Sequence, residues 1–313
     1  MILGETNGFT LFIMRYKDYM IRGQDKAGQV RFFAITTKSL VEKKRKAQNY
    51  SPIATAAIGR LMSAALMMGS MLKNEDERIS IQIKGEGPMG GLVASSNCKG
   101  TVKGYVENPT VVLPPNEYGH LAVGDAITPG KMTVIRYSDL GEPHVTTLDL
   151  VSGEIGDDLS YYFGQSEQTP SIVGVGVSFR KDVHVKAAGG FIVQLLPGAG
   201  DDVISRLEHN VIAMKSVSEI LKANKNDPEA LIKKALEGFD YEVDGTLDVK
   251  FQCGCSKKKS RKILSSLTLH DLEAIKKEGK GTSVSCGFCG RNYDFSHEEV
   301  CEIAEEKLKK LMK

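Results

Sequence analysis

The chain of 313 residues is long enough to form a large domain with a sizeable core and a smaller second domain. Its 41 Lys and Arg residues nearly balance 39 Asp and Glu residues, so the formal charge is only +2. That balance gives no general reason to expect nucleic acid or an anionic membrane as a partner. The first residues contain no basic segment followed by an apolar run, so we expect no export signal and a reducing, cytoplasmic setting.

The first elements are two strands and a long helix. Residues 9–13 and 29–35 have the β-branched and aromatic content of strands. The apolar stretch 54–72 is entered by Ser51 and Pro52, which are typical capping and first-turn residues of a soluble helix. It contains Arg60, and a charge at the centre of a bilayer costs roughly 2.5 kcal/mol or more. We therefore predict a buried core helix and no membrane partner.

Further strands follow this helix in runs. Residues 79–84 and 101–106 alternate apolar and polar side chains with a period of two, which indicates an antiparallel sheet with one wet face. Two more candidates are residues 172–179 and 190–196. Because strands and helices do not alternate strictly, the fold class is predicted as α+β, with antiparallel sheets around a buried central helix.

A glycine-rich segment from Gly85 to Gly90 satisfies the dinucleotide-binding fingerprint. That fingerprint must open a helix whose N-terminus receives the pyrophosphate. Here Pro88 and the strand-like residues 91–94 follow, so we interpret the segment as a turn between strands and expect no nucleotide partner.

From Asp201 onward the pattern becomes helical. One segment carries apolar residues at helical spacing from Val203 to Leu221, and a shorter one begins at Asp227 and ends near Gly238. Their apolar faces must be covered by one or both neighbouring parts of the chain. We expect three regions: an N-terminal α+β core at 1–199, an amphipathic helical linker at 200–245, and a small C-terminal domain at 246–313.

The cysteines give the most specific signal for function. Five of six lie at or beyond position 253, and two close pairs are Cys253 with Cys255 and Cys286 with Cys289. Brought together by the loop between them, they can supply four sulfurs at about 2.3 Å to a tetrahedral structural zinc ion. The intervening glycines permit the tight turns that this requires. We predict one zinc ion held by these four thiolates.

Other interpretations of the cysteines are weaker. Two structural disulfides are disfavoured in a cytosolic protein, and a thioredoxin-type enzyme needs its motif at the start of a helix. His270 and the pair His297 and Cys301 are alternative ligands, although such residues usually serve packing or the surface. Cys98 is interpreted as a small core or strand residue. The basic residues 257–262 are a solvated loop or, alternatively, a moderator of the charge on the cluster.

A zinc site of this kind couples thiol chemistry to structure. The C-terminal segment has few large apolar residues, and so small a module gathers only roughly 3 to 5 kcal/mol from its core. Structural zinc contributes about 10 to 16 kcal/mol of folding free energy. Thiolates oxidised to disulfides can no longer bind the ion, so an oxidant should unfold the module.

The cysteine pairs at this spacing resemble the 33 kDa chaperonin family of redox-regulated bacterial heat-shock chaperones. Segments elsewhere are also similar to the family: 54–65, 152–171, 188–197 and 293–295. The resemblance implies an ATP-independent holdase, inactive when reduced and zinc-bound, that protects unfolding clients under oxidative stress. It further implies that oxidation pairs Cys253 with Cys255 and Cys286 with Cys289, releases zinc, uncovers the linker at 200–245 for clients and favours a homodimer.

Two competing functions were weighed against the chaperone. A zinc-ribbon protein that binds nucleic acid would use the lysines from Lys257 onward, but whole-chain charge and the lack of a nearby aromatic platform disfavour it. An enzyme with catalytic zinc is disfavoured because four thiolates leave no open coordination position. We therefore predict a protein without catalytic residues.

Overall fold

The most deeply buried element is helix α2 (Pro52–Gly69), which is capped by the hydroxyl of Ser51 accepting from the Ala54 amide at 3.2 Å. The computed structural model describes residues 17–138 and 141–311. Among these, α2 is the one helix long and apolar enough to cross a membrane, and 89% of that stretch is buried inside the protein. The predicted core helix is therefore confirmed, whereas the strand expected at 9–13 lies outside the described residues.

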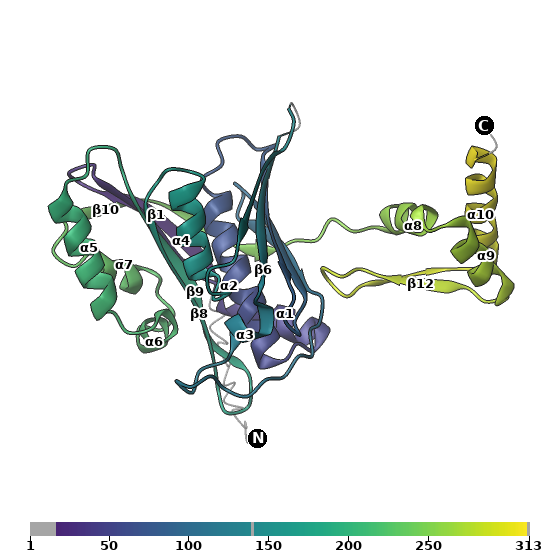
Figure 1. Cartoon of the computed structure of the whole chain (residues 1–313), viewed down its shortest axis with the longest axis horizontal. Coiled ribbons are helices and arrows are strands. Elements are labelled where there is room, and N and C mark those ends of the chain that lie inside the picture. Colours follow the sequence, from purple (N-terminus) through teal and green to yellow (C-terminus); the bar gives the residue numbers. More distant parts are fainter. Residues whose placement is uncertain (1–16, 139–140, 312–313) are drawn as a thin grey trace, which may run out of the picture.

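Two sheets enclose α2 (Figure 1). The five-stranded sheet is antiparallel throughout and has the order β10 (Tyr241–Asp248), β1 (Tyr19–Asp25), β2 (Val30–Thr36), β9 (Val185–Leu195) and β8 (Ser171–Phe179). The six-stranded sheet has the order β11 (Lys250–Phe251), β5 (Thr101–Val106), β4 (Gly91–Asn97), β3 (Arg78–Gly85), β6 (Gly130–Tyr137) and β7 (His144–Asp149). Among the described strands, only the short β11 pairs in parallel, with β5. These sheets confirm the α+β class, and the glycine-rich segment is the predicted turn, here between β3 and β4.

Three shorter helices complete the large body. They are α1 (Lys38–Gln48), α3 (Val123–Ile127) and α4 (Gly156–Gln165). The ion pair between Arg60 on α2 and Glu154 ties the central helix to the segment that leads into α4. The main core consists of α2 and the inward faces of both sheets.

The five-stranded sheet is buried on both faces at its strands β2 and β9, which explains the almost continuous apolar run of β2. Phe33 and Ile35 face the α2 core, whereas Val30, Phe32 and Ala34 face a second core. This second core is closed by α5 (Asp201–Ala213), α6 (Val217–Ala223) and α7 (Glu229–Ala235). The linker helices are thus covered by the large body, with α6 packed on β8 and β9.

The segment after Asp201 differs from the expectation in one respect. It was predicted to remain helical through Leu221, but α5 ends at Ala213 and α6 begins after Ser216. The Ser216 hydroxyl accepts from the Glu219 amide, and the Glu219 carboxylate accepts from the Ser216 amide, which is a capping box. That capping box begins a new helix, so the chain turns and presents both apolar faces to the sheet.

A strand crosses the expected boundary between linker and C-terminal domain. Residues 245 and 246 both belong to β10, which pairs with β1 along its length. β10 is an edge strand with mostly exposed residues. After it, β11 leads directly to Cys253.

The C-terminal module stands to one side of the large body (Figure 1). It comprises α8 (Lys257–Ser266), α9 (Leu269–Lys277), the hairpin of β12 (Thr282–Ser285) and β13 (Asn292–Phe295), and α10 (His297–Leu311). Its buried core is small and contains Leu264, Leu272, Phe295, Val300, Ile303 and Ala304. The basic residues expected in a solvated loop lie on α8, which starts where the Ser256 hydroxyl accepts from the Lys259 amide.

Candidate metal centre

The structure brings together the four cysteines that the sequence singled out. Cys253 and Cys255 lie in the extended segment between β11 and α8, and Cys286 and Cys289 lie in the turn between β12 and β13. The turn is closed by the Gly290 amide donating to the Cys286 carbonyl at 2.8 Å. Gly290 has φ +73°, a conformation that glycine adopts without strain. This turn brings the sulfurs of Cys286 and Cys289 close to those of Cys253 and Cys255.

The spacing of the sulfurs fits a tetrahedral metal site. All four lie within 4.8 Å of one another, with Cys253 and Cys286 at 3.6 Å and Cys255 and Cys289 at 3.4 Å. A tetrahedron with metal–sulfur bonds of about 2.3 Å has edges of about 3.8 Å. The cluster can therefore hold a metal ion, and its four thiols suit zinc chemically.

The Tyr293 hydroxyl supports the cluster from β13. It donates a hydrogen bond to the Cys255 sulfur at 3.1 Å, and this bond lowers the pKa of that thiol because it stabilises the thiolate. Burial instead raises the pKa of Cys253, since a thiolate is less well solvated there. The cluster thus combines thiols of unequal acidity, and a bound cation would favour the thiolate form at all four positions.

The turn between Cys286 and Cys289 contacts the large body at α1 and β5. The Lys44 ammonium donates to the Phe288 carbonyl at 2.5 Å, and the Gln48 amide donates to the Gly287 carbonyl at 3.0 Å. The Phe288 ring meets Tyr105 edge-on, with 5.2 Å between ring centroids. A cleft of about 730 Å³ lies beside this contact, between β4 and β5 and the cysteine segments.

Lys44 is a buried cation that contacts the cysteine turn. Its residue is only 4% exposed, and burial lowers the pKa of its ammonium group to about 8. The sulfurs of Cys289, Cys286 and Cys253 oppose this decrease by attraction.

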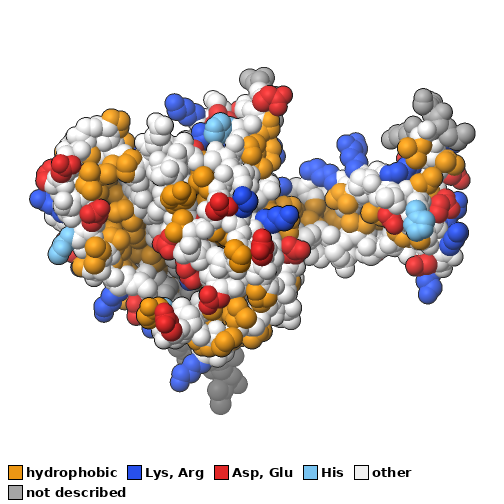
Figure 2. Space-filling view, viewed as in Figure 1, with side chains coloured by type: hydrophobic (Ala, Val, Ile, Leu, Met, Phe, Trp, Pro, Cys, Tyr) orange, Lys and Arg blue, Asp and Glu red, His pale blue; other side chains and the backbone are white. Residues whose placement is uncertain are grey.

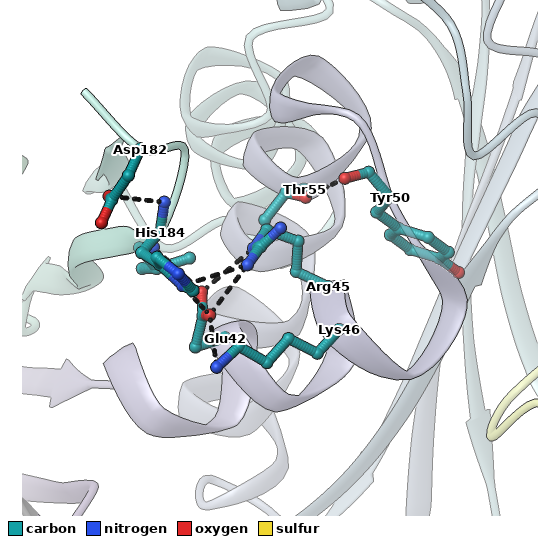
Figure 3. Close-up of polar contacts among 8 residues, drawn as sticks. Glu42, Arg45, Lys46, Tyr50, Thr55, Asp182 and His184 are labelled. Atoms are coloured by element: carbon teal, nitrogen blue, oxygen red, sulfur yellow. Dashed lines mark hydrogen bonds and ion pairs between the residues drawn. The ribbon is translucent and has the colours of Figure 1, made fainter. Parts of the chain in front are cut away.

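A polar cluster anchors α1 to the hairpin between β8 and β9 (Figure 3). The Glu42 carboxylate accepts from the Val185 amide at 2.9 Å and lies 2.9 Å from Arg45 and 2.6 Å from the His184 ring. Burial opposes ionisation, but the hydrogen bonds from Arg45, Val185 and His184 hold the pKa of Glu42 well below its usual range. α1 is therefore fixed to the large body independently of its contact with the cysteine turn.

The alternative ligands lie outside the four-sulfur cluster. His270 has a side chain that is 93% exposed, and His297 and Cys301 face one another on α10 at 3.6 Å. Cys98 lies in the turn after β4, where its thiol donates to the Asn74 carbonyl at 3.6 Å.

The basic residues of α8 are largely engaged by α10. Lys257 forms an ion pair with Glu299, and Arg261 forms one with Glu306. On the face shown in Figure 2, Lys and Arg side chains are interspersed with Asp and Glu, also over the C-terminal module. Neither feature favours a polyanion surface.

Sequence reasoning missed three residues that serve this site. Tyr293 was noted only as part of a family-like segment, and the sulfur that it binds, that of Cys255, lies 38 residues away in the chain. Lys44 and Gln48 belong to a basic helix that resembles any exposed helix in sequence. Their contacts depend on how two distant parts of the chain are placed, and no local pattern signals that.

Together these features define a two-part α+β protein whose C-terminal module can hold a metal ion in four thiols. The sequence model of the family described as Hsp33 protein matches residues 18–296. The chain belongs to the Hsp33 family and is a chaperone, a class of protein that binds unfolded clients.

Similar proteins agree along nearly the whole chain. The 33 kDa chaperonin of Ruminiclostridium cellulolyticum is 42% identical over 292 residues, covering 93% of this chain and 99% of that protein. The 33 kDa chaperonin of Clostridioides difficile is 42% identical with the same coverage. The crystal structure of the 33 kDa chaperonin, a heat shock protein 33 homolog, from Thermotoga maritima has a TM-score of 0.84 at 34% identity and covers 94% of this chain and 99% of that chain.

Proposed function

We propose that this chaperone is an ATP-independent holdase regulated by the redox state of Cys253, Cys255, Cys286 and Cys289. In the reduced state these thiolates hold one zinc ion and the protein is inactive. After oxidation it binds unfolding proteins and keeps them from aggregating. The observation that carries this proposal is the four-sulfur cluster at the base of a module with a very small core.

The zinc ion is proposed as the main source of order in the module. Six buried side chains form its core, and a core of that size contributes only roughly 3 to 5 kcal/mol. A structural zinc ion contributes about 10 to 16 kcal/mol of folding free energy. Loss of the ion should therefore unfold the module. A site filled by four thiolates has no open position for a substrate, so we propose no catalytic role for it.

Oxidation removes the ligands. In each pair two thiolates give up two electrons and form one disulfide, while one hydrogen peroxide molecule takes those electrons and two protons and becomes two waters. We propose the pairs Cys253 with Cys255 and Cys286 with Cys289, following the family resemblance. In the reduced structure the close sulfur contacts join Cys253 to Cys286 and Cys255 to Cys289, so the pairing needs a rearrangement of the turn.

Disorder in the C-terminal module can spread to the linker through β11 and β10. The linker helices are covered by the five-stranded sheet, so unfolding the module does not uncover them directly. However, β11 ends two residues before Cys253, and β10 precedes it as an exposed edge strand. Loss of order at Cys253 should fray both strands. The Tyr241 ring of β10, which packs edge-on against Phe32 at 5.4 Å, then leaves the second core.

The proposed client surface is the pair of apolar faces that meet in the second core. One belongs to the linker at 200–245, and the other to the five-stranded sheet of the core region at 1–199. The module at 246–313 acts as the switch. Such surfaces bind other apolar surfaces when exposed, so a homodimer should be favoured after oxidation, and a cytoplasmic setting provides the reducing resting state.

A direct test combines zinc release with aggregation measurements. The reduced, zinc-loaded protein is treated with hydrogen peroxide at mildly raised temperature, and zinc release, far-ultraviolet circular dichroism and suppression of aggregation of a denatured test protein are followed without nucleotide. We expect one zinc ion released per chain, lower helicity and new suppression of aggregation. Cys98→Ser serves as the control, since Cys98 lies outside the cluster and should behave like the wild type.

An oxidised protein that suppresses aggregation no better than the reduced one would remove the holdase assignment. Zinc binding that survives the oxidation of all four cysteines would remove the proposed switch.

A further inference from the structure

Lys44 is a buried cation whose surroundings come from two parts of the chain. Its ammonium group lies 5.2 Å from the ring centroid of Tyr50 in the large body and 5.7 Å from that of Phe251, just before the first cysteine pair. It donates to the Gln48 side chain and to the carbonyl of Phe288. Among the described residues, no Asp or Glu carboxylate forms an ion pair with it.

Lys44 binds the carbonyl of Phe288, which lies in the turn between Cys286 and Cys289. Three of the cysteine sulfurs, in Cys289, Cys286 and Cys253, act on its charge. Four thiolates around one divalent ion have a net formal charge of about −2. A buried ammonium group is costly when no opposite charge lies beside it, and removal of its partner leaves that cost uncompensated. The metal-bound cluster is therefore the countercharge for Lys44.

Lys44 and its countercharge can separate. Lys44 belongs to α1, which Glu42 fixes to the large body through Val185 and His184 (Figure 3). The sulfurs belong to the C-terminal module. In the described part of the chain, the other contacts of the cysteine turn with the large body include the Gln48 to Gly287 hydrogen bond and the close approach of Gly290 to α1. The rings of Tyr105 and Phe288 also meet there, with the Lys103 ammonium 4.6 Å from the Phe288 centroid.

We propose that Lys44 is a positioning residue that docks the cysteine turn on α1 for as long as the cluster carries its negative charge. This inference rests on the proposed function, because two disulfides without the metal ion are neutral. When each pair of thiolates loses two electrons to peroxide and the ion leaves, Lys44 remains buried with no anion beside it. Undocking then lets water reach the ammonium group, so oxidation releases the module from the large body as well as unfolding it.

The test compares Lys44→Met with Lys43→Met in the full-length, reduced, zinc-loaded protein. Methionine keeps the length of the side chain and suits the apolar rings around it, so α1 should stay folded. Lys43 is on the same helix but exposed, so its variant changes the net charge equally. Nitrogen-15 relaxation of amides in α8 to α10 measures whether the module tumbles with the body, and zinc content is measured on the same samples.

We expect Lys44→Met to shift the docking equilibrium toward the free module by on the order of tenfold. This value lies at the lower end of the effects of breaking a buried charge pair, because the sulfurs are only half-buried. Zinc content should be unchanged, and Lys43→Met should tumble like the wild type. Phe288→Ala, which removes the ring contact from the module side, should also free the module. After oxidation the wild type and Lys44→Met should show the same free module.

A module that stays docked in reduced Lys44→Met, or one that is freed equally by Lys43→Met, overturns the inference. A wild type that remains docked after oxidation and zinc release overturns it as well. The aggregation assay separates this result from the proposed function: a docked Lys44→Met protein that gains holdase activity on oxidation removes the role of Lys44 and leaves the holdase in place. A freed module in a Lys44→Met protein that shows no holdase activity after oxidation leaves the role of Lys44 in place and removes the holdase assignment.

Discussion

Leu221 of α6 gives a way to loosen the linker without touching the cysteines. It is fully buried in the second core, against Gly189 of β9 and away from the core around α2. Leu→Ala in a well-packed core costs about 2 to 5 kcal/mol. Because the loss falls on the contact between linker and sheet, we expect Leu221→Ala to lower the free energy of linker opening by about that amount. This corresponds to an increase of at least about 30-fold in the opening equilibrium.

Native-state hydrogen exchange measures this change directly. Amides of α6 and α7 should exchange faster in reduced Leu221→Ala, whereas amides of α2 should change little. The control is Ile212→Ala on α5, because Ile212 is 85% exposed and its truncation should alter stability by no more than about 0.5 kcal/mol. If the linker opening is what exposes the client surface, the reduced variant should also suppress aggregation in part.

Two results would refute this reasoning. Unchanged exchange in α6 would show that the buried contact does not hold the linker on the sheet. An equal acceleration in α2 would show that linker and body open as one unit, so the linker could not act as a separate element.

Three further predictions concern the metal site and pH. Cys286→Ser should weaken zinc binding and disorder the module even in reductant, while Cys98→Ser should not; metal analysis and circular dichroism check both. Tyr293→Phe should reduce zinc affinity by about tenfold through loss of the bond to Cys255, measured by competition with a chelator. Burial raises the pKa of Asp18 to about 6 from 3.8. Its contribution to stability, up to about 3 kcal/mol, is thus present below pH 4 and lost as pH rises through 6, and Asp18→Asn should remove this dependence from urea unfolding curves.

Local signals in the sequence predicted those elements whose type follows from the pattern of their own side chains. The Ser51 cap and the dense apolar content of α2 identify a helix buried on nearly every side. The β-branched and aromatic residues at 29–35 predicted a strand, and β2 is that strand. In each case the side chains themselves specify the type of element, so neither the partner nor its position is needed for the prediction.

Where the prediction was wrong, a competing signal had been overlooked. The helical periodicity from Val203 to Leu221 hid the capping box of Ser216 and Glu219, which begins a new helix. The alternation of Tyr241, Val243 and Leu247 indicates a strand, yet its first part, up to residue 245, was assigned to a helical linker. Periodicity counted over a long window is insensitive to a break of three residues, whereas capping residues locate it.

The positions of the linker and the cysteine module relative to the large body could not be predicted, and they constrain the proposed switch. The linker is covered by the sheet, whose contact includes Leu207, Leu221, Leu231 and Ile232 of the helices. Oxidation of the distant cysteines changes none of these contacts. It can remove only what the module contributes, namely the docking at Lys44 and the order of β11 and β10. The remaining apolar contact must still open, so oxidation alone should leave the linker mostly closed, and a second, destabilising condition such as heat should be required to expose the client surface.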